Sequence, residues 1–498
     1  MNYGLKMKRY IFVLLFGTLG ALSIHAQQVV LTLNRTIEIA ADSSLQAFIS
    51  QNMYQASVWE FRSFKAARLP SLTLSMTPIE YNSGFVRRYD SENNIDVYRR
   101  QQSLYSSGGL SVRQNLDATG GTFFVNSNLA YMRNFGEQLY TQYTSVPFRI
   151  GYQQNLFGFN SFKWEKRIEP LKFEKAQKQF LYNKENISAQ ATQVFFDLAT
   201  AQTEYDMAVD NVASSDTLYR IGEQRVEIMS ITQTDLMSLK LDVIIAQNRL
   251  KNAEIDLKRA MFAFVSFLNM EKDTPVRLEL PDKHADLRIS VDMALEQARD
   301  NNPDFLDNKQ KILEAERNVD QTQKSAVFDA SFYASIGFNQ VAQNFGGAYR
   351  NPLQQDIVSV GFSIPLIDWG VRKGRANMAK NNLNVARITV QQKEISLEQD
   401  VIMTVNDFNV QQGLMQRAEE AMQIANTVYN STIERFIIGR ANIDNLTIAL
   451  NRQKETQKGY IDALKDYWLS YYKIRKLTLY DFEKQEKILV EFNRIYGF

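Results

Sequence analysis

The side chains that most often carry out chemistry are scarce in this sequence. Its 498 residues include 2 histidines and no cysteine. Thiolate nucleophiles, thiolate metal sites and disulfides are therefore excluded. With only two histidines, imidazole-based catalysis is nearly excluded as well. Carboxylates are plentiful, but no Ser/His/Asp set, metal-ligand spacing or glycine-rich phosphate loop accompanies them, and the glycines of Asp117–Gly121 are better explained by a turn. We therefore expect no enzyme, no metal site and no cofactor site.

Composition indicates a folded chain without a nucleic-acid partner. Hydrophobic residues make up 45% and aromatic residues 12% of the chain, which is enough for large cores and excludes global disorder. The 57 Lys and Arg residues balance 55 Asp and Glu residues, so the net charge of +2 leaves no footprint of nucleic-acid binding. Only 9 prolines interrupt the chain, which permits very long helices.

The N-terminus has the pattern of a secretory signal peptide. Basic residues up to Arg9 precede an apolar run from Tyr10 to Leu22, and a short stretch ending at Ala26 leads into polar sequence. A membrane anchor is the alternative, but the run is shorter than the ~20 residues that a helical span needs. We expect residues 1–26, which include His25, to be removed. No later segment is long and apolar enough for a helical span, so we expect an exported chain without one.

The chain contains the same plan twice. Leu31–Asp42 matches Ile289–Asp300 at an offset of 258 residues, and Leu156–Asn160 matches Leu366–Gly370 at an offset of 210 residues. The difference between the offsets, 48 residues, marks an insertion in the first half. Each half is expected to form a helix, two strands, a very long helix, a tight turn and a final helix.

These matches predict the organisation of the mature chain. We expect a first repeat over residues 27–287, a second repeat over 288–482 and a C-terminal tail over 483–498. The insertion covers about 82–145 and carries its own hairpin pattern, with two alternating runs on either side of Asp117–Gly121. The sequence leaves open whether this hairpin joins the other strands or projects beyond them.

Four segments outside the insertion alternate apolar and polar residues with a period of two, which gives each strand one apolar and one polar face. The apolar positions expected to face lipid are Leu72, Leu74, Phe148, Ile150, Phe332, Ile336, Val358, Val360 and Phe362. Lengths near ten residues suit tilted strands that cross a bilayer, whereas a soluble β-sandwich is the alternative with the same alternation. The export signal and the small polar residues favour a barrel with a wet interior. Because known barrels need at least about eight strands, several chains are expected to share one.

Two very long helices are expected between the strands and the turns. No proline occurs from about Gly370 to Ile438, so a helix there would reach roughly 100 Å, and its first-half partner runs from about Phe173, after Pro170, to Met229. Two heptad-spaced hydrophobic ladders follow the second helix, namely Leu383, Val390 and Leu397 and Ile388, Ile395 and Ile402. Seams on nearly opposite sides let a helix contact a neighbour on each flank, as a stave does in a closed helical barrel. A helix buried in an ordinary bundle is the alternative.

With these elements in place, the chain resembles the TolC-type outer-membrane channel proteins. Ile364–Gly370 is similar to the family's strand-ending P-L-F-D-x-G, and Arg435–Leu446 resembles its helix-turn-helix signature. Asn301–Asp304 resembles the N-N-P near the start of family repeats. Asn445 stands where the signature usually has Asp, and Asp444 precedes it. The similarity covers nearly the whole mature chain, in both repeats.

The resemblance implies a mainly α protein with membrane β-strands, a TolC-like trimeric α/β barrel with an internal two-fold sequence repeat. Three protomers of four strands each would share a twelve-stranded β-barrel in the outer membrane of a Gram-negative cell. Their helices would form a long α-helical barrel in the periplasm. The implied partners are two further copies of the chain, outer-membrane lipid, a periplasmic adaptor and an inner-membrane pump. Such a channel gives the pump an exit for small molecules or for secreted protein, and it performs no chemistry.

The resemblance also implies that the two helix turns form the periplasmic entrance and meet the adaptor. The residues expected there are Gly439, Arg440, Asp444, Asn445 and Asp235. Charged side chains at a constriction can set ion selectivity, and our hypothesis is that Arg440 or Asp444 helps to hold the tip closed. The plainer interpretation is that these are solvated turn or helix-capping residues, since Asp readily caps helices.

A non-channel periplasmic coiled-coil scaffold or adhesin is the alternative function. It explains the long helices, but not two membrane-like hairpins at matching places in the two repeats. Fractionation separates the two functions, because heat-modifiable trimers in outer-membrane detergent extracts indicate a channel and soluble rods indicate a scaffold.

Overall fold

The structure, a computed structural model, describes most of the chain. The described residues are 29–135, 139–272, 274–282, 287–326, 328–364, 366–438 and 440–489. The predicted signal peptide lies outside the described residues, and so do Gly439 and residues 490–498 of the predicted tail.

The chain divides into two compact units, here called the sheet unit and the helical unit. The sheet unit comprises Met53–Gln179 and Pro303–Leu397. The helical unit comprises the described residues up to Asn52, Phe180–Asn302 and the chain from Glu398 onward. Both halves of the sequence contribute to each unit, so the units do not follow the predicted boundary between repeats. The internal sequence repeat stays a prediction.

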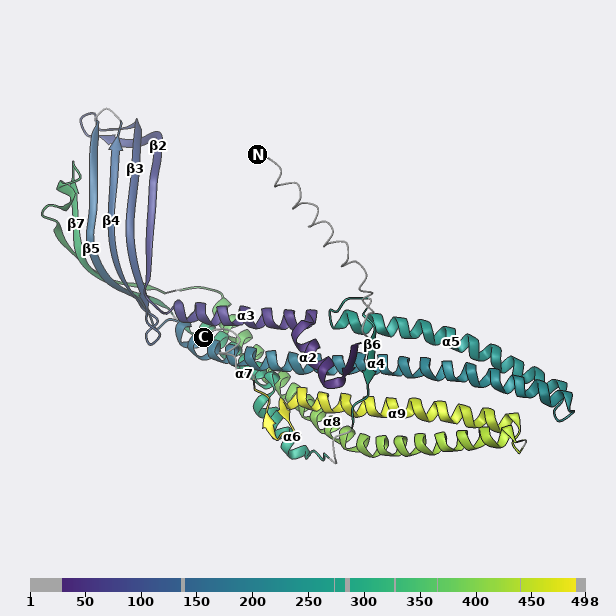
Figure 1. Ribbon diagram of the computed structural model, residues 1–498. Coiled ribbons are helices and arrows are strands. Elements are labelled where there is room, and N and C mark those ends of the chain that lie inside the picture. Colours follow the sequence, from purple (N-terminus) through teal and green to yellow (C-terminus); the bar gives the residue numbers. More distant parts are fainter. Residues whose placement is uncertain are drawn as a thin grey trace, which may run out of the picture. The chain divides into compact units, whose positions relative to one another are not determined.

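The sheet unit contains a six-stranded antiparallel sheet (Figure 1). In spatial order its strands are β2 (Ser71–Asp90), β3 (Ile95–Asn115), β4 (Thr122–Asn134), β5 (Tyr140–Leu156), β7 (Asp329–Ala342) and β8 (Leu353–Ser363). All neighbouring strands run antiparallel, and β2 and β8 form the two edges of the sheet.

The predicted number of four strands in each protomer is wrong, because the sheet has six. The insertion expected over residues 82–145 supplies the whole of β3 and β4, and the predicted turn at Asp117–Gly121 joins them. This hairpin lies between β2 and β5 and pairs with both. Pairing on both sides satisfies backbone N–H and C=O groups that a projecting hairpin would leave open, which is the physical reason for the larger sheet.

Two helices of 67 residues each are the longest elements of the chain. They are α4 (Ser161–Glu227) and α8 (Val371–Ile437), and α8 closely matches the expected proline-free helix. Shorter helices follow them, α5 (Gln233–Phe267) and α9 (Ile443–Thr478), and each is about half as long as the long helix before it, as the sequence predicts. The long-helix and short-helix order is therefore confirmed in both halves.

The first long helix begins earlier than predicted. The sequence placed its start after Pro170, but α4 begins at Ser161 and contains this proline. Proline interrupts one backbone hydrogen bond of a helix, at a cost of ~3 kcal/mol in an isolated helix interior. Ile168 and Leu171 are buried on either side of the proline, so packing of the apolar face keeps the segment helical. Two further helices belong mainly to the sheet unit, α3 (Leu45–Ala66) and α7 (Pro303–Lys324).

The helical unit has one hydrophobic core. Its fully buried aromatic residues are Phe195, Phe196, Phe264, Phe408, Tyr467 and Tyr471. The short helices α2 (Leu33–Ser43) and α6 (Val291–Asn301) contribute to this core, and β1 (Val29–Thr32) pairs in parallel with β6 (Val276–Glu279) beside it. The core residues of α4 and α8 come from the middle of these helices, so the small elements pack around the middle of the long helices.

A buried ionic cluster closes the end of α9. Arg475 binds Glu185 with an Nε–Oε2 distance of 2.9 Å and Asp481 with an Nη1–Oδ2 distance of 2.6 Å. Asn302, from the N-N-P segment, donates to the backbone carbonyl of Leu477 at 2.9 Å. Asp481 lies in the small hairpin of β9 (Tyr480–Asp481) and β10 (Glu486–Lys487).

None of the helices in the described part of the chain combines the length and the apolar run that a membrane span requires.

Candidate functional site

One face of the sheet carries all nine residues that the sequence marked as lipid-facing. The register pairs Leu74 with Leu110, Val125 with Ile150, and Phe332 with Val360, and cross-strand partners lie on the same face. Of the nine residues, Phe332 is half-buried, and eight are exposed, namely Leu72, Leu74, Phe148, Ile150, Ile336, Val358, Val360 and Phe362. The sheet thus presents a continuous apolar face.

The opposite face of the sheet is mostly small and polar. Its members include Ser75, Ser111, Asn126, Gln153 and Ser359. Ser111 donates a hydrogen bond to Asn126 Oδ1 at 2.8 Å, which links β3 and β4 on this face. The strands therefore separate an apolar surface from a surface that water can wet.

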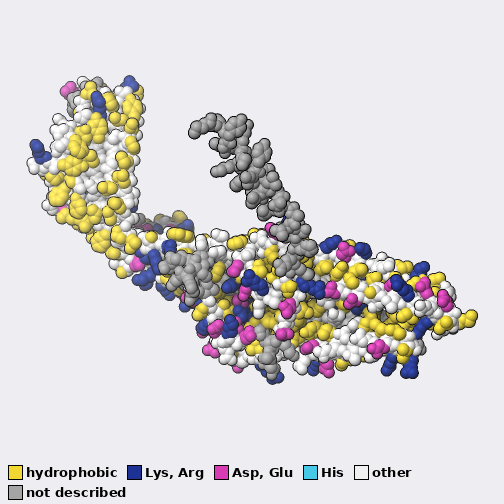
Figure 2. Space-filling model, viewed as in Figure 1, with side chains coloured by type: hydrophobic (Ala, Val, Ile, Leu, Met, Phe, Trp, Pro, Cys, Tyr) yellow, Lys and Arg dark blue, Asp and Glu magenta, His cyan; other side chains and the backbone are white. Residues whose placement is uncertain are grey.

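The apolar face is too large to be an ordinary exposed surface. Val358 exposes 75% and Leu72 exposes 70% of its surface. Figure 2 shows hydrophobic and uncharged side chains over most of the sheet, whereas Lys, Arg, Asp and Glu gather over the helices and near strand ends. Soluble proteins rarely leave contiguous apolar patches of this kind in water, so the face requires a protein or lipid cover.

The first helix turn, between α4 and α5, is held by backbone and capping hydrogen bonds. The N–H of Ser230 donates to the carbonyl of Arg225 at 2.8 Å, and Met229 adopts a left-handed conformation with φ 58°. Thr232 caps α5, and Asp235 Oδ2 accepts from the Thr232 N–H at 2.9 Å and from its hydroxyl at 2.8 Å. These hydrogen bonds, the backbone one first, lower the pKa of Asp235 below its ordinary value. For Asp235 the structure thus shows the capping role that the sequence also allowed.

The second helix turn, between α8 and α9, has the same backbone design. The N–H of Arg440 donates to the carbonyl of Arg435 at 2.8 Å, and the Asn442 side chain accepts from the N–H of Asn445 at 2.9 Å. Asp444 lies in the first turn of α9, and both Arg440 and Asp444 are exposed. No hydrogen bond or ion pair of either charged side chain is recorded within the described part of the chain. Their role at an entrance stays a prediction.

Arg225 connects the two turns. Its Nη2 donates to the carbonyl of Phe436 at 2.7 Å and to that of Ile437 at 3.1 Å, which are backbone groups of the last turn of α8. The guanidinium also lies 5.0 Å from the centre of the buried Phe436 ring. A cation at a helix C-terminus is favourable because the last carbonyls have no helical partner. No role for Arg225 could be predicted from the sequence, because its partners are backbone groups that are distant along the chain.

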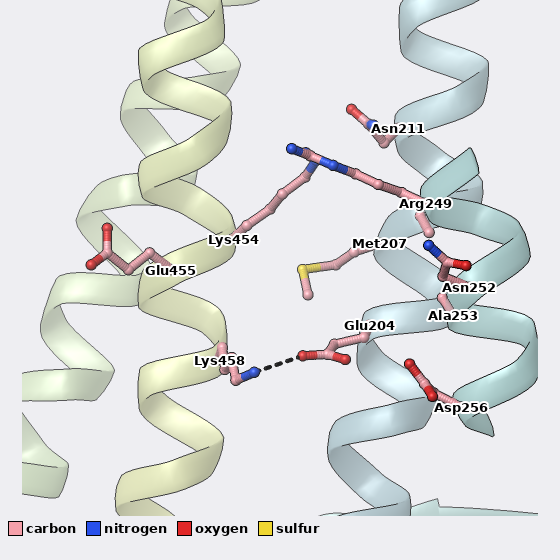
Figure 3. A pocket seen from close by; sticks show the side chains of 11 residues that line it. Glu204, Met207, Asn211, Arg249, Asn252, Ala253, Asp256, Lys454, Glu455 and Lys458 are labelled. Carbon is pink, nitrogen blue, oxygen red and sulfur yellow. Dashed lines mark hydrogen bonds and ion pairs between the residues drawn. The ribbon is translucent and has the colours of Figure 1, made fainter. Parts of the chain in front are cut away.

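A cavity of about 360 Å³ lies between α4, α5 and α9 in the helical unit (Figure 3). Glu204 and Lys458 bridge one end of it with an oxygen–nitrogen distance of 3.0 Å. Lys454 and Arg249 extend into it from opposite sides. Burial, and to a smaller extent the charge of Arg249, lowers the pKa of Lys454 to about 8. No cluster of three or more His, Cys, Asp or Glu side chains that could hold a metal ion occurs among the described residues.

Comparison with known proteins identifies the fold. Residues 294–478 match the model of the family described as outer membrane efflux protein. The fold is similar to that of the Campylobacter jejuni CmeC outer membrane channel, with a TM-score of 0.64 and 13% identity over 93% of this chain and 88% of that one. It is also similar to the outer membrane protein VceC of Vibrio cholerae, with a TM-score of 0.64 and 13% identity over 92% of this chain and 97% of that one.

A third similar structure is the open state of the Neisseria gonorrhoeae MtrE outer membrane channel, with a TM-score of 0.59 and 12% identity over 90% of this chain and 88% of that one. Among curated proteins, none matches the sequence significantly. The resemblance to TolC-type channel proteins is therefore confirmed, by a match to the outer membrane efflux protein family over residues 294–478 and by a fold shared over nine-tenths of the chain.

Proposed function

We propose that this protein is an outer-membrane channel through which an inner-membrane pump exports its cargo. The observation that carries the proposal is the sheet, with a continuous exposed apolar face, a mostly polar opposite face and two free edges. In a bilayer, only helices and closed barrels satisfy all backbone groups, so an open sheet of this kind must close with other strands.

The proposed assembly is a homotrimer. One chain supplies six strands, which are fewer than a closed barrel needs, and both edges of its sheet present unpaired backbone groups. Joining copies edge to edge removes these edges and turns the apolar faces toward lipid. The helices α4, α5, α8 and α9 of the three copies would together line the periplasmic duct. The fold shared with the CmeC, VceC and MtrE structures supports this assembly.

The proposed entrance lies at the two helix turns. Ile228, Met229 and Ile438 are exposed there, and Met229 exposes 93% of its surface. Apolar side chains at the end of a helical hairpin offer a contact for a periplasmic adaptor, and the charges of Arg440 and Asp444 lie beside them. We infer that this end receives the cargo and contacts the adaptor, and that the sheet passes the cargo through the outer membrane.

The periplasmic scaffold, the alternative function, leaves the apolar face unexplained. A soluble rod with eight exposed apolar residues on one face of a sheet would aggregate, whereas a bilayer covers the same face without any further partner. The channel accounts for both the helices and the sheet.

A pair of neighbouring substitutions tests the membrane orientation of the sheet. Leu74→Arg places a charge on the apolar face, where a buried Arg costs ~2–4 kcal/mol near the bilayer midplane. Ser75→Arg places the same charge on the polar face of the same strand. We expect Leu74→Arg to reduce heat-modifiable trimers in the outer membrane and Ser75→Arg to leave them in place. Equal assembly of both variants contradicts the proposed orientation.

Conductance in planar bilayers tests the entrance. If Arg440 or Asp444 helps to hold the tip closed, neutralising both as Arg440→Gln and Asp444→Asn raises the conductance of purified trimers. An unchanged conductance means that neither residue is part of a gate, and it leaves the channel itself intact. A trimer with no ion conductance under any condition refutes the channel.

A further inference from the structure

The inserted hairpin of β3 and β4 occupies the middle of the sheet. β3 pairs with β2 from Arg113 opposite Ser71 onward, and β4 pairs with β5 from Thr122 opposite Gln153 onward. β2 and β5 have no direct pairing with each other in the sheet order, because the hairpin separates them. A hairpin that merely projected from the sheet would leave β2 and β5 as neighbours. The insertion therefore widens the sheet by two strands.

The two inserted strands continue both faces of the sheet. On the apolar face, Leu110 of β3 lies opposite Leu74 of β2, and Val125 of β4 lies opposite Ile150 of β5. On the polar face, the hydrogen bond from Ser111 to Asn126 joins the strands to each other. A hairpin that is surrounded by water on both sides has no need of an apolar face in register with its neighbours.

Two rows of aromatic side chains cross the apolar face, and each includes a residue of β4. In one row Phe123 lies beside Tyr152, with ring centres 4.8 Å apart. In the other, Tyr131 lies beside Tyr143, with ring centres 5.0 Å apart. Phe123 and Tyr131 are separated by eight positions, or about 27 Å along a strand. A barrel strand is tilted by about 40°, so this spacing rises roughly 20 Å through the membrane, close to the apolar band of about 25 Å between the aromatic girdles of membrane β-barrels.

The sequence of β5 is also fitted to the inserted strand. Gly151 of β5 lies under the ring of Phe124 of β4, and a Cβ at this glycine would come within 2.3 Å of Phe124 Cζ and 2.8 Å of the carbonyl of Ala334. Phe124 is buried and stacks on Tyr333 of β7, with ring centres 5.6 Å apart. An aromatic ring placed over a strand glycine is a device that fixes strand pairing. Neighbouring strands therefore depend on the hairpin for their packing.

We propose that β3 and β4 are membrane-spanning wall strands, and that three copies of the chain close an eighteen-stranded barrel. The inference rests on the proposed channel and trimer. Because five antiparallel pairings separate the two edges, β2 and β8 run in opposite directions, and β8 of one copy can pair antiparallel with β2 of the next. Barrel diameter grows roughly linearly with strand number, so the opening is about 1.5-fold wider than that of a twelve-stranded barrel. The opening at the outer membrane therefore admits larger molecules than a duct of four strands per chain.

Cysteine labelling tests the position of the hairpin, and the cysteine-free chain is a clean background. Val125→Cys and Asn128→Cys place single thiols on the apolar and the polar face of β4, and Leu74→Cys and Ser75→Cys are matched controls on β2. In intact outer membranes, we expect a water-soluble, membrane-impermeant maleimide to label Asn128→Cys and Ser75→Cys. We expect a lipid-soluble maleimide alone to label Val125→Cys and Leu74→Cys. Labelling of both β4 thiols by the water-soluble reagent, with the β2 pair still alternating, overturns the proposal and retains the channel.

The width of the opening is measured with polymers of graded size. Ser75→Cys is exposed to maleimide-polyethylene glycols in the full chain and in a variant that lacks residues 95–139, in which β2 leads directly to β5. We expect the full chain to react with polymers of about 1.5-fold larger radius. If the full chain and the shortened chain have the same polymer size limit, the eighteen-stranded barrel is overturned. If the shortened chain does not assemble, the labelling of the β4 thiols still decides whether β3 and β4 belong to the wall.

The mass of the solubilised complex gives the number of copies. Three copies support eighteen strands, whereas two copies would give twelve and overturn the proposal without affecting the channel. If the proposed channel function itself is wrong, the result is different, because the chain then forms no outer-membrane complex at all.

Discussion

Arg225 is the side chain through which one helix turn most directly contacts the other, and its removal is expected to loosen the entrance. The guanidinium donates to two terminal carbonyls of α8, at 2.7 Å and 3.1 Å, and lies 5.0 Å from the Phe436 ring. Hydrogen bonds from a charged group contribute ~1.5–3 kcal/mol when buried, and the half-exposed position of Arg225 reduces this to ~1 kcal/mol or less for each. The ring contact adds ~0.5 kcal/mol.

The expected total is about 2 kcal/mol for Arg225→Ala, which corresponds to a roughly 30-fold change in an equilibrium constant. If the link exists only when the two turns are together, this change increases the fraction of open channels by up to that factor. Single-channel recording in planar bilayers measures the open fraction directly. Entry of a large antibiotic into intact cells is a second measurement of the same change.

Arg220→Ala is the matched control for this experiment. Arg220 lies on the same helix, but it is exposed and its recorded ion pair is with Asp216, at 2.9 Å. Such an exposed pair contributes little, so the control is expected to behave as the unsubstituted protein does. The reasoning is refuted if Arg225→Ala and Arg220→Ala have the same open fraction while both form normal trimers.

Three other substitutions have expected results that follow from the helical unit. Burial lowers the pKa of Lys454 from 10.5 to about 8. The folded chain therefore binds the Lys454 proton less tightly than the unfolded chain does. As a result, the free energy of unfolding rises as the pH increases from 8 to 10.5. Lys454→Met should raise the melting temperature at pH 7 and remove this rise, and a melting series with an unchanged pH slope contradicts the assignment. Arg475→Met leaves two buried carboxylates without their cation and should cost ~3–5 kcal/mol in chemical unfolding, with most of the loss recovered when both carboxylates are also converted to amides. Asp235→Ala removes the capping box of α5, so amides in its first turn should exchange faster with solvent. Because the pKa of Asp235 is lowered, its stabilising effect is present at neutral pH and is lost as pH falls through the lowered pKa, whereas Asp444→Ala should change little.

Features that depend on local sequence could be predicted. The lack of proline from Gly370 to Ile438 determined α8 almost to the residue, because helix continuity is a property of consecutive residues. The period of two assigned the faces of the strands for the same reason, and the exposed apolar positions such as Leu72 and Val358 are where the alternation placed them. The family resemblance rested on such local segments in a fixed order.

Features that depend on which elements meet could not be predicted. The hairpin of β3 and β4 had a clear local pattern, but its pairing with β2 and β5 is a choice among partners that alternation does not encode. The sequence predicts a helix start after Pro170, but α4 continues through this proline. The burial of Ile168 and Leu171, which stabilises the helix there, depends on tertiary packing. Arg225 bonds to backbone carbonyls more than 200 positions away, so no pattern of side chains could mark it.

The outer parts of β2 and β3 are bound only to each other. Gly84–Asp90 pairs with Ile95–Gln101, while β4 pairs with β3 only from Ser103 onward. Substitutions or length changes in this two-stranded ribbon therefore leave the pairing of the wall untouched. If the chain occupies the outer membrane as proposed, the ribbon therefore tolerates changes in sequence and length that the strands of the wall do not.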